Sequence, residues 1–281
     1  MSDVLAGYSR ALYANWLLHR PLQLLVDAGE GLQLGLGRGV FQPTTLAITH
    51  GHSDHVLGLP GLAAARRFGK GAQDKPLTVC FPDTSAGAMT MRTLLAELWK
   101  GVEFPLVWVP MRPGAAHLLP KGRRLEAFAV THVPGEPCLG YRVLEPRRRL
   151  KPEFAALPQA ELEALGRAGR RGELMESVDH VVFAHSGDAM PIDPSLVQGA
   201  DLLVHDATFL EEADRREPIH ASTREALAVA AAAGVGGLVL HHLSVRYARE
   251  GALATLAAQR AASGYAGPVW LLDEATFTPV P

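Results

Sequence analysis

The chain has few cysteines for its length, and they lie far apart. Cys80 and Cys138 are the only two among 281 residues, and neither belongs to a Cys-x-x-Cys motif. This usage predicts a reducing compartment, with both thiols acting as small core residues. A zinc site in this chain therefore has to be built from histidine and carboxylate side chains.

Long apolar runs and an excess of basic charge are also missing. No stretch approaches 18 uninterrupted apolar residues, and the N-terminal segment has no basic region followed by an apolar run and a cleavage site. These absences predict a cytoplasmic protein without membrane contact. The net charge of −2 argues against a protein that coats nucleic acid with its whole surface, although it leaves room for a local basic patch.

The sequence does contain a regular succession of apolar segments and helical segments. Helices are expected within residues 84–100 and 222–234. Strands are expected within residues 22–31, 44–50, 76–82, 104–111, 125–132, 179–188, 200–209 and 235–244. Several of these strands end on histidine or aspartate, which is typical of a metal site on an α/β scaffold. The length suits one domain over residues 1–281.

The segment from residue 50 to 55 concentrates metal-capable side chains directly after an apolar strand. It reads His-Gly-His-Ser-Asp-His, and Gly51 gives the turn backbone freedom. Alternate residues of such a turn can converge on one point, so the segment can supply ligands to two adjacent metals. Imidazole and carboxylate donors suit zinc, with manganese or iron as substitutes. Each metal needs four or more donors, and three candidates stand at later strand ends: His132, Asp188 and His242.

The segment THGHSDH resembles the His-x-His-x-Asp-His signature of the metallo-β-lactamase superfamily. Other segments resemble its ribonuclease Z branch, in order and with similar spacing, from about residue 20 to 250. They are LLVDAGEGLQLGL, HGHSDHVLGLPGL, THVPGEPCLGYRV, HSGDAMP, DLLVHDATFLEEA, IHAST and LHHLSVRY. The first signature alone indicates the superfamily, whereas the Ser-x-Arg-Tyr tail and the paired HDAT and HAST segments are specific to the branch.

The resemblance implies an α/β fold, an αββα four-layer sandwich with a dinuclear metal site at one edge. It implies two Zn²⁺ ions, with Mn²⁺ or Fe²⁺ as possible substitutes, and a bridging water activated by the metals. The implied ligands are His50, His52 and His132 for one ion, Asp54, His55 and His242 for the other, and Asp188 as the bridge. The family also implies a homodimer.

The resemblance assigns roles to residues around the ligands as well. Asp27 would orient a ligand imidazole. Asp54 would also accept the proton of the attacking water. Asp206 and His220 would form a carboxylate–histidine pair that stabilises phosphoryl charge or protonates the leaving oxygen. The last motif adds two candidate substrate-binding residues, Ser244 and Arg246.

Three departures from the family pattern bear on function. The segment GYSRALYANWLLHR stands where the family has a Gly-rich strand and turn, and Asp206 stands where it usually has Glu. Residues 142–180 replace the long arm that grips tRNA with a shortened basic insert, which is expected to be helical. Its arginines are candidate phosphate contacts, among them Arg147, Arg148 and Arg149.

The sequence leaves three functions open. The first is a phosphodiesterase that cleaves precursor tRNA at its 3′ side, and the second is the same centre acting on a small phosphodiester such as a cyclic nucleotide. A short insert favours the second, whereas a basic protrusion favours the first. The third is a nucleic-acid-binding module without enzymatic activity, which the complete set of ligand-capable residues disfavours.

Overall fold

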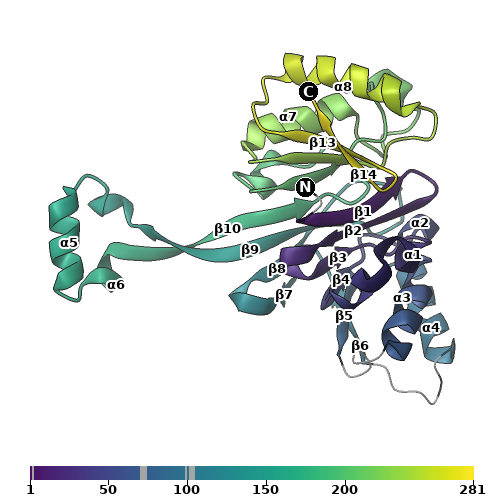
Figure 1. The fold of residues 1–281 in the computed structure, drawn as a ribbon, viewed down its shortest axis with the longest axis horizontal. Coiled ribbons are helices and arrows are strands. Elements are labelled where there is room, and N and C mark those ends of the chain that lie inside the picture. The colour runs from purple at the N-terminus through teal and green to yellow at the C-terminus, as the bar shows by residue number, and fades with distance from the viewer. Residues whose placement is uncertain (2, 70–74, 99, 101–104) are drawn as a thin grey trace.

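Two β-sheets pack face to face and carry helices on their outer sides (Figure 1). The computed structural model describes residues 1, 3–69, 75–98, 100 and 105–281. The expected strand at 104–111 and the expected helix at 84–100 each include residues outside this set. Among the described residues, no helix combines the length and the apolar content that a membrane span requires.

The first sheet has six strands in chain order. They are β1 (Leu5–Arg10), β2 (Ala14–His19), β3 (Leu24–Val26), β4 (Thr45–Ala47), β5 (Leu77–Pro82) and β6 (Leu106–Met111). The first three are antiparallel, and β3 to β6 are parallel. Four helices cover its outer face: α1 (Leu32–Leu36), α2 (Ser53–Val56), α3 (Leu59–Phe68) and α4 (Ala86–Leu98).

The second sheet has eight strands in the order β14-β13-β12-β11-β10-β9-β8-β7. In chain order they are β7 (Ala116–Leu118), β8 (Arg124–Ala129), β9 (Leu139–Leu150), β10 (Met175–His185), β11 (Leu203–Asp206), β12 (Leu238–His241), β13 (Val269–Asp273) and β14 (Thr276–Val280). Strands β10 to β13 are parallel. Helices α7 (Thr223–Ala233) and α8 (Arg249–Ser263) pack on its outer face.

The four layers follow from alternation along the strands. Leu17 packs between the sheets, whereas its neighbour Leu18 packs under the helices of the first sheet. In the second sheet, Val204 faces the other sheet and Leu203 faces the helices. Successive side chains of a strand point to opposite faces, so a run that is apolar at every position is buried on both sides. The expected αββα sandwich is confirmed.

Residues 142–180 form a projecting hairpin, which we call the arm (Figure 1). Strands β9 and β10 pair antiparallel out to Leu150 and Met175, and α5 (Gln159–Arg167) and α6 (Arg171–Leu174) lie at the far end. The sequence predicted a helical insert here. Helices take up only the far end, and the two core strands continue outward as a two-stranded ribbon whose outer residues are mostly charged or polar.

Most expected elements are present, with shorter bounds. The strand expected within residues 22–31 is reduced to β3, and the one within 44–50 to β4. The hairpin of β1 and β2 was not expected from the sequence. Helix α7 begins with a capping box between Ser222 and Glu225 and ends at Gly234 in the left-handed conformation, as its Ser-Thr start and terminal glycine predict.

Candidate metal centre and acid–base pair

The seven residues predicted as metal ligands come together at one edge of the two sheets. They follow β4, β8, β10 and β12, whose ends meet at this edge. Three ligand atoms, from His50, His52 and His132, lie within 4.8 Å of one another, and so do those of Asp54, His55 and His242. Asp188 forms a further set with His50 and His55 at the same spacing. The two donor sets are thus adjacent, with Asp188 in contact with both.

Four of the histidines are oriented through their Nδ1 atoms. His50 donates to the Thr49 hydroxyl at 3.0 Å and His55 to Asp27 at 2.8 Å. His132 donates to the carbonyl oxygen of Ile219 at 2.8 Å, and His242 donates to the Thr208 hydroxyl at 2.8 Å. A proton on Nδ1 leaves Nε2 as a free electron pair, which is the form that binds a metal.

The free nitrogens point at one another and at carboxylate oxygens. His50 Nε2 lies 2.9 Å from His52 Nδ1, and His132 Nε2 lies 3.5 Å from the same atom. Asp188 Oδ2 lies 3.3 Å from His55 Nε2 and 3.0 Å from His242 Nε2. Such a gathering of electron pairs needs a cation between them. Asp188 Oδ1 is buried and has no hydrogen-bonding partner among the described residues, so the donor set fits divalent metal ions.

The electrostatics around Asp188 also support a site for cations. Burial alone would raise the pKa of Asp188, but the charges of His242 and His55 hold it well below its usual range. Burial lowers the pKa of His50, with a further contribution from His55. Burial would also lower the pKa of His55, yet Asp188 and Asp27 raise it well above the ordinary value. Asp188 is therefore held ionised at the point where the two donor sets meet.

Asp206 and His220 form the predicted pair beside the metal-capable residues. His220 Nδ1 lies 2.6 Å from Asp206 Oδ2, so an aspartate reaches the histidine without the extra methylene of a glutamate. Asp206 is buried and also accepts from Ala189 N and from the amide and hydroxyl of Thr208. Burial would lower the pKa of His220, but Asp206 raises it to about 9. His220 is thus held as a proton donor.

The local chain explains where His220 stands. It lies two residues before Ser222, the N-cap of α7. Arg215 donates to the carbonyl oxygen of His220 at 2.9 Å and pairs with Glu225 at 2.8 Å. The ring of His220 stacks on that of His242, with centroids 4.9 Å apart, and lies 4.6 Å from that of His132. The helix start therefore fixes the acid–base pair against both donor sets.

Sequence reasoning missed several residues that hold the ligands. Thr49 and Thr208 each link a buried aspartate to a histidine, and their only sequence signal is their place beside motif residues. Glu136 accepts from Gly51 N at 2.8 Å and from the Ser85 hydroxyl at 2.7 Å. A Cβ at Gly51 would lie 2.4 Å from that hydroxyl oxygen, so only glycine fits between His50 and His52.

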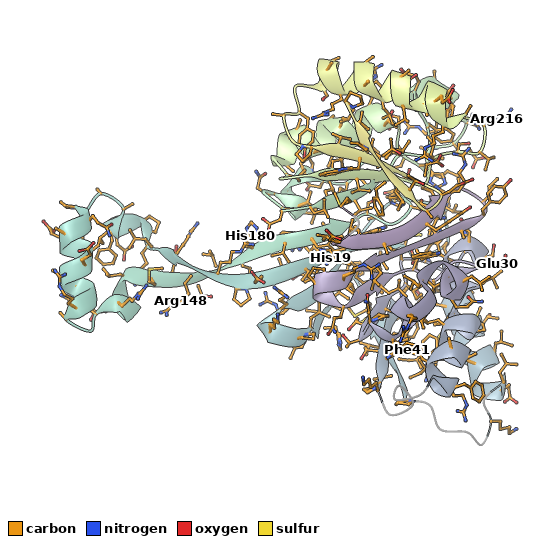
Figure 2. The ribbon with its side chains drawn as sticks, in the orientation of Figure 1. His19, Glu30, Phe41, Arg148, His180 and Arg216 are labelled. Carbon is orange, nitrogen blue, oxygen red and sulfur yellow. The ribbon has the colours of Figure 1, made fainter. Side chains whose placement is uncertain are left out.

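The predicted substrate-binding residues lie at different places. Ser244 is buried beside the centre, and its amide donates to the carbonyl oxygen of Thr208. Arg246 lies over the ring of Phe209, at 5.1 Å from its centroid, and Phe209 in turn contacts His220. These residues border the centre. The three arginines predicted in the insert lie instead on the arm, where Figure 2 labels Arg148.

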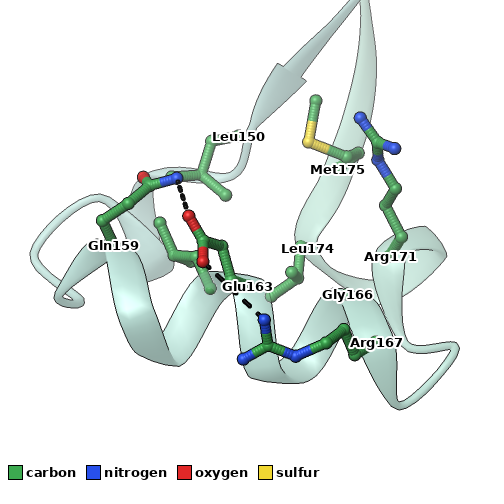
Figure 3. A pocket seen from close by; sticks show the side chains of 9 residues that line it. Leu150, Gln159, Glu163, Gly166, Arg167, Arg171, Leu174 and Met175 are labelled. Atoms are coloured by element: carbon green, nitrogen blue, oxygen red, sulfur yellow. Dashed lines mark hydrogen bonds and ion pairs between the residues drawn. The ribbon is translucent and has the colours of Figure 1, made fainter.

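The arginines of the arm differ in their partners. Arg147 pairs with Asp201 at 2.7 Å, and Arg149 pairs with Glu176 at 2.7 Å. Arg148 is exposed, and its side chain has no hydrogen bond or ion pair among the described residues. At the far end of the arm, a cavity of about 570 Å³ lies between α5 and the strand ends, lined by Leu162, Arg167 and Met175 among others (Figure 3). This cavity lies away from the metal-capable residues.

Comparisons with known proteins agree with the geometry. Residues 23–144 match the metallo-beta-lactamase superfamily model, and residues 172–243 match a beta-lactamase superfamily domain. Ribonuclease Z of Gemmatimonas aurantiaca is 33% identical over 252 residues, which cover 81% of this chain and 78% of that protein. Ribonuclease Z of Halobacterium salinarum is 31% identical over 280 residues, covering 92% and 88%.

Solved structures share the fold at lower identity. Human tRNase Z, short form, has a TM-score of 0.64 and 21% identity, with 99% of each chain covered. The metallo-beta-lactamase fold protein YhfI from Bacillus subtilis has a TM-score of 0.66 and 16% identity, covering 97% of this chain and 98% of that one. The ribonuclease relatives confirm the predicted metal-dependent hydrolase and argue against a module without enzymatic activity.

Proposed function

This chain belongs to the ribonuclease Z family of the metallo-β-lactamase superfamily, and from that membership we propose that it cleaves precursor tRNA at the 3′ side. The observation that carries the proposal is the pair of donor sets that share Asp188, with Asp206 and His220 beside them. Two adjacent cations and a positioned proton donor suit the hydrolysis of a phosphodiester, because they stabilise the attacking and the leaving oxygen.

We further propose that the resident metals are two Zn²⁺ ions, for which Mn²⁺ or Fe²⁺ can substitute. Imidazole nitrogen and carboxylate oxygen are zinc donors, and both cysteines lie outside the donor sets. One ion belongs to His50, His52 and His132, the other to Asp54, His55 and His242, and Asp188 serves both. When bound, the pair neutralises phosphate charge and makes water acidic enough to attack at neutral pH.

Side chains of this protein carry out the proton transfers. The carboxylate of Asp54, next to His55 and His242, accepts the proton of the attacking water. His220 donates a proton to the leaving oxygen as the phosphorus–oxygen bond breaks, and Asp206 keeps His220 charged until then. Asp27 holds His55 in the orientation that points Nε2 at Asp188.

The arm serves, in this proposal, as a shortened basic insert of the single domain over residues 1–281. Its ribbon carries Arg148 without a partner among the described residues, so this side chain is available for a phosphate. A homodimer and a cytoplasmic location complete the proposal, on the ground of the family alone. A small phosphodiester is the second candidate substrate, favoured by the acidic partners that already neutralise Arg147 and Arg149.

The deciding experiment runs two substrates side by side, with zinc or manganese added to the purified protein. One is a precursor tRNA with a 3′ trailer, and the other is bis(p-nitrophenyl) phosphate. Asp54→Ala controls for contaminating nuclease. We expect cleavage at the 3′ side of the tRNA, lost in the variant. Hydrolysis of the small diester alone would replace tRNA by the second candidate, and no activity on either would refute the phosphodiesterase.

The arm can be tested separately, since Leu150 and Met175 are paired neighbours. A variant in which a two-residue Asn-Gly turn replaces residues 151–174 keeps the ribbon and removes α5 and α6. We expect weaker tRNA cleavage with a shallower salt dependence, and unchanged hydrolysis of bis(p-nitrophenyl) phosphate. Arg148→Ala should also weaken tRNA cleavage, and it should reduce the slope of the salt dependence by about the value of one phosphate contact. Equal losses on both substrates would mean that the arm supports the fold rather than tRNA.

A further inference from the structure

The N-terminal hairpin of β1 and β2 reaches the metal-capable centre through its only two buried polar side chains near the turn. Ser9 and Asn15 are directly paired across the hairpin, and their exposed fractions are 2% and 3%. Asn15 is the only asparagine in the chain. Neither residue is a metal ligand or a proton carrier in the function proposed above, yet a buried amide is costly to keep unless its hydrogen bonds are satisfied.

A continuous series of hydrogen bonds runs through this pair. The amide of His242 donates to the Ser9 hydroxyl at 2.7 Å, and this hydroxyl donates to Asn15 Oδ1 at 2.7 Å. Asn15 Nδ2 then donates to Asp54 Oδ2 at 3.0 Å. The series assigns the amide orientation, because a flipped Asn15 would place its oxygen against the Asp54 carboxylate. Asp54 lies after a strand of the first sheet and His242 after a strand of the second, yet both belong to the same donor set.

The contact falls on the carboxylate oxygen that faces the donor set. Asp54 Oδ2 lies 3.5 Å from His55 Nε2 and 3.6 Å from His242 Nε2. Asn15 Nδ2 also lies 3.3 Å from His55 Nε2. A donor fixed at this point limits the rotation of the carboxylate and decides which of its electron pairs remains for an ion.

The surrounding backbone is built for this approach. A Cβ at Gly29 would lie 2.4 Å from the carbonyl oxygen of Asp54 and 2.5 Å from the amide nitrogen of Asn15, so only glycine lets the two segments meet. His242 has a φ of 65°, which is unfavourable for a residue with a side chain and persists only where neighbours hold it. The Ser9 hydroxyl holds its amide in that conformation.

We propose that Asn15 is a positioning residue of the metal centre: held by Ser9, its amide fixes the Asp54 carboxylate and sets the separation of Asp54 from His242. The inference rests on the proposed assignment of these two residues to one ion. The hairpin that stands in place of the family's Gly-rich start thereby acquires a role, which is to connect a loop of the first sheet with a loop of the second at one metal site.

The test counts metal ions, so it needs no substrate. Wild type, Asn15→Ala, Asn15→Asp and Ser9→Ala are loaded with zinc, dialysed against a graded chelator, and analysed for ions per chain. We expect wild type to hold two ions. Asn15→Ala and Asn15→Asp should hold one of them about 10- to 100-fold more weakly, with the other unchanged. Ser9→Ala should show a smaller loss, because Asn15 keeps its donor.

A matched control separates this role from simple packing. Gln259 is another buried amide, bonded to Leu210 and Thr223 between α7 and α8, and Gln259→Glu should leave both ions bound as in wild type. Thermal unfolding of the metal-free proteins measures how much each substitution destabilises the fold in the absence of metal. If Asn15→Asp fails to fold, Asn15→Ala and Ser9→Ala decide. Retention of both ions with wild-type affinity by Asn15→Ala overturns the inference.

The result is independent of the substrate. Wild type that holds two ions without cleaving precursor tRNA contradicts the proposed substrate, while the inference is still decided by the ion count of the variants. Cobalt in place of zinc provides a second measurement, since its visible spectrum reports the ligand geometry. The Asn15→Ala spectrum should differ from that of wild type for one ion only, whereas identical spectra would contradict a positioning role.

Discussion

The two halves of the molecule approach the centre with the same arrangement of aspartate, threonine and histidine. In the first half, Asp27 accepts from the Thr49 hydroxyl at 2.8 Å, and Thr49 accepts from His50 at 3.0 Å. The other side chain in contact with the Asp27 carboxylate is His55, at 2.8 Å. Asp27 has a left-handed backbone, with a φ of 58°. Every histidine tied to Asp27 is therefore a candidate metal ligand.

The second half repeats the arrangement with a different outcome. Asp206 accepts from the Thr208 hydroxyl at 2.9 Å, and Thr208 accepts from the candidate ligand His242 at 2.8 Å. The other side chain in contact with the Asp206 carboxylate is His220, at 2.6 Å. Whereas His55 is fully buried, the side chain of His220 keeps 13% of its surface exposed. One aspartate thus orients two candidate ligands, and the other orients one candidate ligand and the proposed proton donor.

The comparison indicates that one structural arrangement serves two purposes, according to where its second histidine lies. The fully buried second histidine, His55, faces Asp188 among the candidate ligands. A partly exposed one can meet substrate, so the proton that its aspartate stabilises on the ring can be passed on. The largest test of this comparison removes the second histidine from each half in turn.

His220→Ala should lower kcat on precursor tRNA by about 10²- to 10⁴-fold, the range of a general acid, and should leave two metal ions per chain. His55→Ala should abolish activity through loss of a metal ion. Rates at saturating metal, together with metal analysis, separate the two cases. The comparison would break if His220→Ala lost a metal ion, because His220 would then be a ligand like His55.

A second test uses pH and the metal-free protein. Asp206 raises the pKa of His220 to about 9, above its ordinary value of 6.5, despite burial that would lower it. The stability gained from this pair is fully present below about pH 6.5 and is lost as the pH rises through 9. Asp206→Asn should therefore lower the free energy of unfolding by on the order of 3 kcal/mol at pH 6, and by much less at pH 10.

Urea unfolding at both pH values measures the effect, and imidazole NMR follows the pKa directly. Asp201→Asn is the matched control, since Asp201 binds the surface residue His180 at the same 2.6 Å. A surface pair contributes less than about 1 kcal/mol, so this control should change little at either pH. A loss for Asp206→Asn that is equal at pH 6 and pH 10 would show that Asp206 acts by packing and not by charge.

The sequence carried the ligands of both halves but not the connections between them. The αββα layers were expected from the family resemblance. His50, His55 and His242 were predictable as candidate ligands because their motif spacing has a chemical reason. Thr49 and Thr208 were not, because a threonine next to a motif residue is ordinary β-strand composition. The hairpin strands β1 and β2 were missed because the turn between them, residues 11–13, reads Ala-Leu-Tyr and contains none of the usual turn residues.

The smallest test replaces the threonines, which are nearly isosteric with valine. Thr49→Val and Thr208→Val should each lower the affinity for one metal ion by about 10-fold. This is the lower end of the range for residues that orient metal ligands. Excess metal should restore the kcat of Thr49→Val, because its hydroxyl serves ligands only. It should not fully restore that of Thr208→Val, because Asp206 loses a donor and its alignment with His220 loosens. Steady-state kinetics over a metal series gives both numbers, and full recovery of both variants would mean that the two halves differ in exposure but not in function.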